Sequence, residues 1–220
     1  MASPASPRAR VRALLQGQGD GRGIAVPQAH RLAARIQERD WDEFSCDPTQ
    51  LANALRDLAD AVNPDGVAVC LPDVLLEGGR DILTSEQGQA ALEATRRLKA
   101  SMGERVALVA CLPGPSLLDS GIDGLLEAGK AFLAAGVHAL VILGDDADDG
   151  QSVSLSTLAN IARFHQAPTV GVPASLGLPA VELVPFDAPH PASGLVLTET
   201  HLPRETDVSE LEDWVDTVRG

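Results

Sequence analysis

Short apolar runs alternate with segments of helical periodicity along most of the chain. The runs are rich in Val, Ile, Leu and Ala and are bounded by Gly, Pro, Asn or Asp, a pattern typical of buried strands. Six runs are predicted to be strands, namely 66–71, 105–112, 138–143, 167–174, 181–186 and 194–199. The run 23–26, which comes first in the chain, is a seventh candidate. Apolar strands that alternate with amphipathic helices indicate a parallel sheet covered by helices. The pattern therefore predicts an α/β fold of about seven parallel strands and is compatible both with a doubly wound sheet and with an incomplete barrel.

The clearest helix signal lies between residues 47 and 62. Asp47 is a good N-cap, Pro48 stands at the first helical position, and apolar residues from Leu51 to Val62 recur on one face. Similar spacing predicts further helices over 7–16, 32–39, 85–103, 125–135, 155–164 and 207–218. No segment has the composition and length of an interdomain linker. The prediction is one domain over residues 1–220, with residues 1–7 disordered.

The charge balance limits the partners that the chain is expected to bind. Lys and Arg number 17 and Asp and Glu number 31, so the formal net charge is −14 at pH 7. Such an acidic surface repels nucleic acid phosphates and anionic membranes, and neither is expected as a partner. Cys46, Cys70 and Cys111 form no CxxC pair, which argues against a disulfide framework and a structural zinc site. Since no apolar signal core or membrane-length run is present, the expected location is the cytoplasm.

Candidate chemistry lies where the predicted strands end, because ligands of parallel α/β folds bind at the carboxyl ends of strands. The catalytic and substrate-binding candidates that follow the strands are Asp73, Pro113, Gly114, Asp145, Asp146 and His201. Asp73 would either project into a barrel mouth or crevice, or cap the next helix as a loop carboxylate. His201 would either shuttle protons or have a structural role.

Two further clusters have both a functional and an ordinary interpretation. The acidic run 145–149 could hold a hard cation or form a solvated loop, and its departures from EF-hand spacing favour the loop, so no metal is expected. His30 and Arg31 could clamp an anionic substrate beside the first strand, or could occupy surface positions of a helix. No Gly-x-Gly-x-x-Gly or phosphate-loop spacing is present, so nucleotide binding through those motifs is unsupported.

Several segments, taken in order, resemble the uroporphyrinogen decarboxylase superfamily, whose members are (β/α) barrels. Residues 41–58 are similar to a family helix with a short Asp-Pro cap, and GVAVCLPDVLLEGG (66–79) is similar to the strand that ends in a Ser-Asp-Ile-Leu-type motif. Residues 95–118 resemble the family's helix, strand and Gly-x-Pro turn, and residues 126–146 resemble its helix and strand with an Asp-Ser-type ending. Residues 197–218 are similar to its Gly-His-Gly segment and closing helix. The resemblance implies a shortened TIM-barrel-like fold of about seven parallel strands.

The resemblance also implies roles for single residues. Asp73 falls on the aspartate that points into the family's cleft and assists decarboxylation by holding pyrrole N–H groups, Asp145 falls on a second aspartate, and His201 falls on the family's histidine. Of the family's Arg-Gln-Ala-Gly-Arg segment only Arg31 is kept, and the chain has no tyrosine for the cleft. About one βα unit is missing between residues 175 and 194. The His-x-Cys zinc motif of the methyltransferase branch is absent, because no cysteine follows His201 two residues later.

The first functional expectation is a decarboxylase-like lyase that acts without a cofactor on a carboxylated small molecule or a tetrapyrrole. Asp73 would be its electrostatic anchor, His201 its proton donor and Arg31 its carboxylate clamp. The alternative is a methyltransferase component of O-demethylase type that works with a corrinoid or tetrahydrofolate. A third interpretation is a non-catalytic binding subunit. Because missing strands expose a sheet edge, a homo-oligomer or a heteromer that completes the barrel is also expected.

Overall fold

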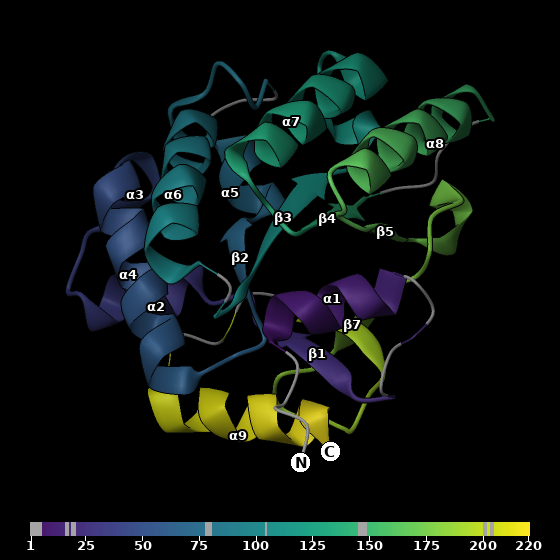
Figure 1. The fold of residues 1–220 in the computed structure, drawn as a ribbon. Coiled ribbons are helices and arrows are strands. Elements are labelled where there is room, and N and C mark those ends of the chain that lie inside the picture. Colours follow the sequence, from purple (N-terminus) through teal and green to yellow (C-terminus); the bar gives the residue numbers. More distant parts are fainter. Residues whose placement is uncertain are drawn as a thin grey trace.

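Seven parallel strands form a ring with helices packed around it (Figure 1). The computed structural model describes residues 6–15, 18, 21–77, 81–103, 105–144, 149–199, 202 and 205–220. The strands are β1 (Gly23–Val26), β2 (Gly66–Cys70), β3 (Ala107–Pro113), β4 (Ala139–Leu143), β5 (Thr169–Val172), β6 (Glu182–Val184) and β7 (Gly194–Thr198). Hydrogen bonds join β2-β3-β4-β5 into one parallel sheet and β1-β7-β6 into another. The fold is a TIM-barrel-like α/β barrel, shortened from the eight strands of a complete (β/α)₈ barrel.

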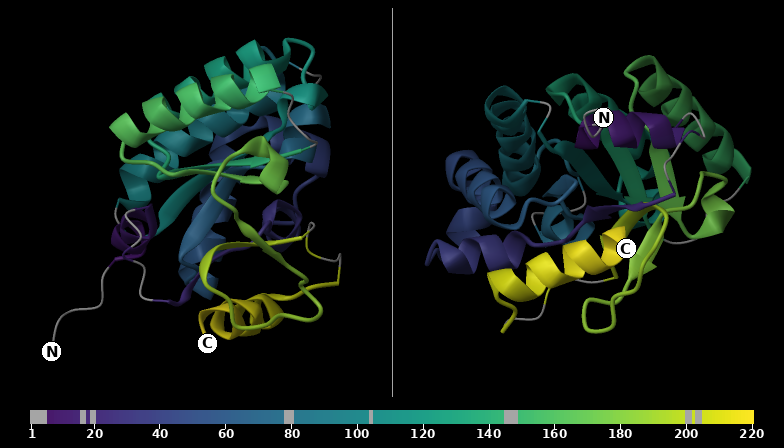
Figure 2. Two further views of the ribbon diagram at one scale, coloured as in Figure 1. Left: turned by 90° about the vertical axis from the view of Figure 1, so that its right-hand side faces the viewer. Right: turned by 60° about the horizontal axis from the view of Figure 1, so that its bottom comes forward.

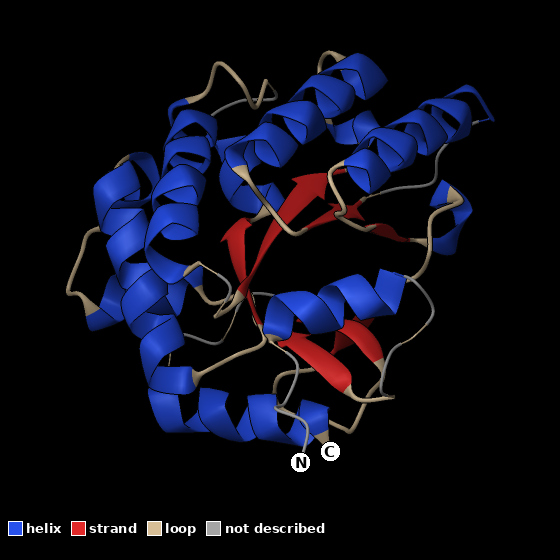
Figure 3. Ribbon diagram, viewed as in Figure 1, coloured by secondary structure: helices blue, strands red, loops and turns tan. Residues whose placement is uncertain are grey.

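The helices cover the outside of the ring and one of its ends. They are α1 (Pro7–Leu15), α2 (His30–Ile36), α3 (Trp41–Cys46), α4 (Pro48–Val62), α5 (Pro72–Glu77), α6 (Glu86–Met102), α7 (Gly121–Ala135), α8 (Asp149–Phe164) and α9 (Val208–Arg219). Helices α3, α4 and α6 lie on one flank, α7 and α8 on the next, and α9 below the strands in the view of Figure 1 (see also Figure 2). Helix α1 lies across the ring, and Figure 3 shows the strands enclosed by helices.

Local sequence signals begin and end these helices. The Asp47 carboxylate accepts hydrogen bonds from the first-turn N–H groups of α4, and Pro48 needs no partner for its nitrogen. Ser85 caps α6, and Asp207 caps α9 through a reciprocal capping box. At the end of α7, Gly136 takes the left-handed conformation (φ 102°) that a side chain would disfavour.

Alternating strand residues divide the apolar side chains between the barrel interior and the layer beneath the helices. In β4, Ala139 and Val141 face the interior, whereas Leu140 and Ile142 pack toward the helices. Val11 of α1 joins the interior cluster and closes the amino end of the barrel. Each fully buried Val or Leu stabilises the fold by about 1.5–3 kcal/mol relative to exposure. The interior is therefore a packed core and not a channel.

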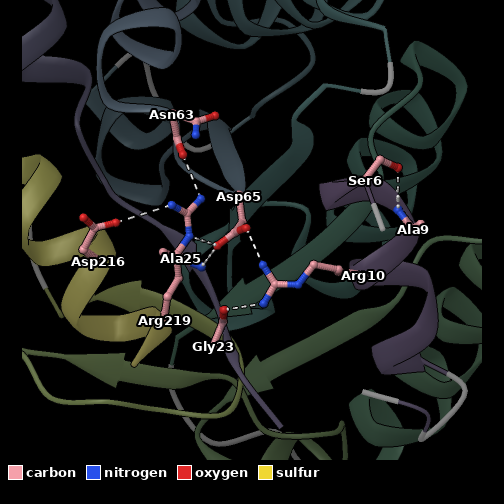
Figure 4. Close-up of polar contacts among 9 residues, drawn as sticks. All are labelled: Ser6, Ala9, Arg10, Gly23, Ala25, Asn63, Asp65, Asp216 and Arg219. Carbon is pink, nitrogen blue, oxygen red and sulfur yellow. Dashed lines mark hydrogen bonds and ion pairs between the residues drawn. The ribbon is translucent and has the colours of Figure 1, made fainter. Parts of the chain in front are cut away.

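Side chains close the seam between β1 and β2, where no backbone ladder forms (Figure 4). Asp65 precedes β2 and is 2% exposed. Its Oδ2 accepts from the Ala25 N–H of β1 at 3.1 Å and from Arg219 Nε of α9 at 3.0 Å, and its Oδ1 accepts from an Arg10 guanidinium nitrogen of α1 at 2.6 Å. Arg10 also donates to the Gly23 carbonyl at 2.9 Å. One buried carboxylate thus holds two strands and two helices together.

The shortening of the barrel falls between β5 and β7, where every residue is described. This stretch contains the short strand β6 and a 3₁₀ turn at Ala174–Leu176, but no α-helix. A single parallel bridge between Gly171 and Ala180 joins β5 to the segment before β6. The missing βα unit therefore lies between residues 175 and 194, where the sequence indicated. At this point a single β-bridge, and not a ladder of backbone hydrogen bonds, connects the two sheets.

The predicted elements agree in type with the structure. Several of the predicted bounds were wrong, and two short helices were not predicted. Helix α7 begins at Gly121 and not near 125, α8 begins at Asp149 and not near 155, and α2 ends at Ile36 and not at 39. The short helices α3 and α5 were not predicted as separate elements. Of the segment expected to be disordered, residues 1–5 lie outside the described residues, whereas the hydroxyl and carbonyl oxygens of Ser6 accept hydrogen bonds from the Ala9 and Arg10 N–H groups of α1. In the described part of the chain, no helix combines the length and apolar character that a bilayer crossing requires.

Candidate active site

The carboxyl ends of the strands meet at the end of the barrel opposite α1. The side chains that face the interior at this end are apolar, and they include Leu71, Leu143, Val172 and Leu197. Polar groups follow on the connecting segments above this apolar floor. A ligand bound at the mouth would therefore contact an apolar surface below and polar side chains around it.

At the end of β1, the polar side chain of Gln28 is buried and held in place by hydrogen bonds. It is 6% exposed, its backbone N–H donates to the Thr198 hydroxyl at 3.1 Å, and its side-chain amide donates to the Thr198 carbonyl at 2.9 Å. These bonds tie the carboxyl ends of β1 and β7 together. Sequence reasoning did not select Gln28, although it follows an apolar strand by the same rule that selected Asp73.

The structure places His30 and Arg31 in different environments. His30 begins α2, is 2% exposed, and lines a small apolar space with Phe44 and Leu75. Arg31 is on the surface, where its guanidinium pairs with Glu77 at 3.2 Å and lies 4.1 Å from the Trp41 ring centroid. The shared anion clamp stays a prediction, and Arg31 would have to exchange Glu77 for a substrate anion. The Glu77 and Trp41 partners were not predicted, and nothing in their spacing indicated them.

Asp73 lies at the carboxyl end of β2, as the second residue of α5. Asp73 is exposed and stands in the first turn of this helix. Both interpretations from the sequence, a mouth carboxylate and a helix-terminal carboxylate, are compatible with this position. Its role in chemistry stays a prediction.

Two glycines bring the ends of β3 and β4 into close backbone contact. The Gly114 N–H donates to the Leu143 carbonyl at 2.8 Å, and the Gly144 N–H donates to the Val172 carbonyl at 3.1 Å. A Cβ atom on Gly144 would lie 2.7 Å from Gly114 Cα, so only glycine fits there without a shift. Pro113 and Gly114 thus form a fixed part of the rim, in the place predicted for substrate contact.

Three of the predicted site residues, Asp145, Asp146 and His201, lie outside the described residues. Their assigned roles stay predictions. Within the described ranges, no group of three or more His, Cys, Asp or Glu side chains is arranged to hold a metal ion.

The buried cysteines carry unreactive thiols. Cys111 faces the barrel interior, and burial raises its pKa to about 12. Burial and the neighbouring Cys111 raise the pKa of Cys70 well above its ordinary value, and the Cys70 thiol donates to the Cys111 carbonyl at 3.5 Å. Cys46 is half-buried on α3. Neither Cys70 nor Cys111 is suited to act as a thiolate ligand or nucleophile.

Comparison with known proteins supports the fold independently. No protein-family model matches the chain, and no curated protein matches it. Among solved structures, the chain is similar to a methyltransferase from Methanosarcina mazei, with a TM-score of 0.70 and 12% identity, over 96% of this chain and 98% of that chain. At this identity the likeness shows that the two chains share a fold, a TIM-barrel-like α/β barrel.

Proposed function

We propose that the protein is a methyltransferase of the uroporphyrinogen decarboxylase superfamily, and that it works at the mouth of its barrel with a corrinoid- or tetrahydrofolate-bearing partner. The observation that carries this proposal is the fold match to a methyltransferase over nearly the full length of both chains. The ordered sequence resemblance to the superfamily, which contains corrinoid-linked methyltransferases, supports it independently. Decarboxylation, the first expectation from the sequence, receives no support from the comparisons.

The apolar floor of the mouth suits methyl transfer. A methyl group is small and apolar, and the half-buried Leu143 and Val172 offer it a surface without competing hydrogen bonds. Exclusion of water from such a surface strengthens the electrostatic contacts around the reacting atoms. The chain's contribution would be to seat the methyl group, orient the acceptor and move a proton.

Asp73 and His201 are the residues to which we assign the proton and charge chemistry. Asp73 would orient the substrate or accept its proton at the carboxylate, and His201 would act as the second acid or base. When bound, the corrinoid or tetrahydrofolate supplies the carrier of the one-carbon unit. A zinc-activated thiol is a poor fit to this chain, since His201 lacks the paired cysteine and Cys70 and Cys111 are buried with raised pKa values.

An anaerobic assay with methylcobalamin and methyltetrahydrofolate as donors, and a panel of thiols as acceptors, tests the proposal. We expect methyl transfer, and we expect Asp73→Asn to lower kcat/KM by about 100-fold. Asp42→Asn is the matched control, because Asp42 is likewise the second residue of a six-residue helix and is exposed, but its helix follows no strand. Carbon dioxide release from a carboxylated substrate, with no transfer from either donor, would overturn the proposal in favour of the lyase.

The partner is tested separately by native mass spectrometry of protein purified anaerobically from its own host. A bound corrinoid or a co-purifying corrinoid protein is the expected result. A bare homo-oligomer with a carboxylated ligand would favour the lyase. Sedimentation over a wide concentration range checks the self-association that the shortened barrel suggests, and a strictly monomeric species would remove that expectation.

A further inference from the structure

A hollow lies on the outside of the barrel, between helix α9 and the loop that joins β6 to β7. In a complete (β/α)₈ barrel a helix follows each strand, but the fully described segment between β6 and β7 contains no α-helix. The loop runs beside α9 instead (Figure 2), and its Ala192 N–H donates to the Val218 carbonyl at 3.2 Å. The hollow has a volume of about 390 Å³, which falls within the range of small-molecule sites.

The described residues that line this hollow include four carboxylates and no basic side chain. The carboxylates belong to Asp187 of the loop, Glu205 before α9, and Glu210 and Asp213 of α9. Glu210 accepts from the Asp207 N–H at 2.9 Å in the capping box of α9. The other three carboxylates form no ion pair within the described part of the chain. A concave surface lined by one sign of charge concentrates ions of the opposite sign, so the hollow attracts a cation.

Two buried polar groups at the hollow have no hydrogen-bond partner among the described residues. Thr206 is 2% exposed and Trp214 is 1% exposed, and both line the hollow. Neither the Thr206 hydroxyl nor the Trp214 indole N–H forms a hydrogen bond. Because an unpaired buried polar group costs free energy, a ligand that bonds to it recovers this cost. The unpaired groups are an observation independent of the carboxylates.

The carboxylates and the indole N–H select different parts of one ligand. Carboxylates favour an ammonium group, which has three donors and a positive charge, and they repel an anion. The Trp214 indole can only donate, so it requires a ligand atom with a lone pair, and beside four carboxylates that atom has to be uncharged. A hydroxyl oxygen meets this requirement. The half-buried Phe186 ring also lines the hollow and offers a face to the hydrocarbon part or the ammonium group.

We infer that this hollow binds an organic ammonium ion that carries hydroxyl groups, of the chemical class of the amino sugars. Its ammonium group pairs with the carboxylates that have no partner in the chain. One of its hydroxyl oxygens accepts from the Trp214 indole N–H, and the Thr206 hydroxyl bonds to the same molecule. The site is on the outside of the barrel, and its occupancy does not depend on the proposed methyl transfer.

The test has an internal control, because the chain contains two tryptophans. The indole N–H of Trp41 donates to Glu77 at 3.0 Å, and Trp41 does not line this hollow. Two-dimensional nitrogen–proton NMR resolves the two indole signals, and Trp41→Phe assigns them. Glucosamine, titrated in a buffer that contains no amine, should shift the signal of Trp214 and leave that of Trp41 in place. Equal shifts of both signals would overturn the inference.

Two comparators separate the requirements for charge and for hydroxyl groups. Glucose keeps the hydroxyl groups without the ammonium group, and cyclohexylamine keeps the ammonium group without the hydroxyl groups. Each should bind at least about tenfold more weakly than glucosamine, because each lacks one of the two sets of hydrogen bonds. Equal affinity for glucosamine and cyclohexylamine, or the same shift of the Trp214 signal with magnesium chloride alone, would contradict the proposed ligand class.

Two substitutions locate the site. Thr206→Val removes the buried hydroxyl and nearly keeps the shape of the side chain. Since this hydroxyl has no partner in the free protein, the variant should keep its melting temperature but bind glucosamine about tenfold more weakly. Asp213→Asn should weaken binding similarly, and Glu212→Gln is its matched control, because Glu212 is an exposed neighbour on α9 that does not line the hollow. A lower melting temperature of Thr206→Val, or equal affinities of Asp213→Asn and Glu212→Gln, would refute the assignment.

A third substitution tests a cation that the chain itself could supply. Arg204 adjoins Glu205 in the sequence and lies outside the described residues. Arg204→Gln should leave the affinity for glucosamine unchanged. Binding that becomes at least about tenfold tighter would mean that the carboxylates already hold this arginine, and the hollow would then not be a site for a separate ligand.

Discussion

Replacing Asp65 with alanine should destabilise the barrel more than replacing any exposed carboxylate of the chain. The change removes an acceptor shared by Arg10, Arg219 and the Ala25 N–H, at 2.6, 3.0 and 3.1 Å. An orphaned buried N–H costs about 1–3 kcal/mol, and removing one partner from a buried ion pair costs about 3–5 kcal/mol. These costs overlap, and the two arginine side chains are 17% and 25% exposed, so water recovers part of their solvation.

We therefore expect Asp65→Ala to lower the free energy of unfolding by about 3–5 kcal/mol, a large share of the 5–15 kcal/mol typical of a domain. Urea unfolding followed by circular dichroism measures this difference. Asp60→Ala is the matched control, since Asp60 pairs with Arg105 at 2.8 Å but their side chains are 47% and 62% exposed. An exposed pair of this kind contributes about 0–1 kcal/mol.

Asp65→Asn separates charge from hydrogen bonding, because the amide oxygen can still accept from the Ala25 N–H. Its destabilisation should fall between those of Asp65→Ala and Asp60→Ala. If Asp65→Ala loses no more stability than Asp60→Ala, the side-chain seam does not hold β1 against β2, and the closure of the ring must have another cause.

Three further predictions concern thiols, a helix cap and the rim. Ellman's reagent at pH 8 should react rapidly with Cys46 and should react with Cys70 and Cys111 only in denaturant. Burial raises the pKa of both of these thiols, that of Cys111 to about 12. Rapid reaction of all three thiols would contradict this. The backbone hydrogen bond from the third residue of α4 lowers the pKa of Asp47 from 3.8, so the cap stabilises the fold above that value and its contribution is lost as the pH falls through the lower folded pKa. Asp47→Asn should therefore flatten the acid limb of stability against pH, and parallel curves would refute this. Gly144→Ala puts a methyl group 2.7 Å from the backbone of Gly114. Thermal denaturation should show that the folded state loses about 1–3 kcal/mol of stability, and an unchanged melting temperature would contradict this.

Periodicity and capping residues predicted most of the fold because these signals are local. The apolar runs became strands whose bounds differ by at most two residues at each end, and Asp47, Ser85 and Asp207 cap helices that the spacing predicted. The choice between a doubly wound sheet and a barrel was not accessible, because it depends on which strands pair across the fold. The Asp65 cluster, whose Arg10 and Arg219 partners stand 55 and 154 residues away, shows the same limit.

The site was predictable only by position relative to the strand ends. That rule selected Asp73, Pro113 and Gly114, and the structure places them at the carboxyl ends of β2 and β3. It missed Gln28, and it could not foresee that His30 would be buried while its neighbour Arg31 pairs on the surface. Burial of one face of a short helix depends on the elements packed against it, which a single sequence does not reveal.

The packed interior of the barrel keeps the two ends chemically separate. Interior side chains fill the space from Val11 at the amino end to Leu71 near the mouth, and they separate Lys99 from Asp73. Substitutions at distant sites with no shared partners have effects on free energy that add. Lys99→Gln should therefore leave methyl transfer unchanged. Coupling between Lys99→Gln and Asp73→Asn, measured as the methyl-transfer rate in a double-mutant cycle, would instead mean that the two ends communicate through the shared scaffold.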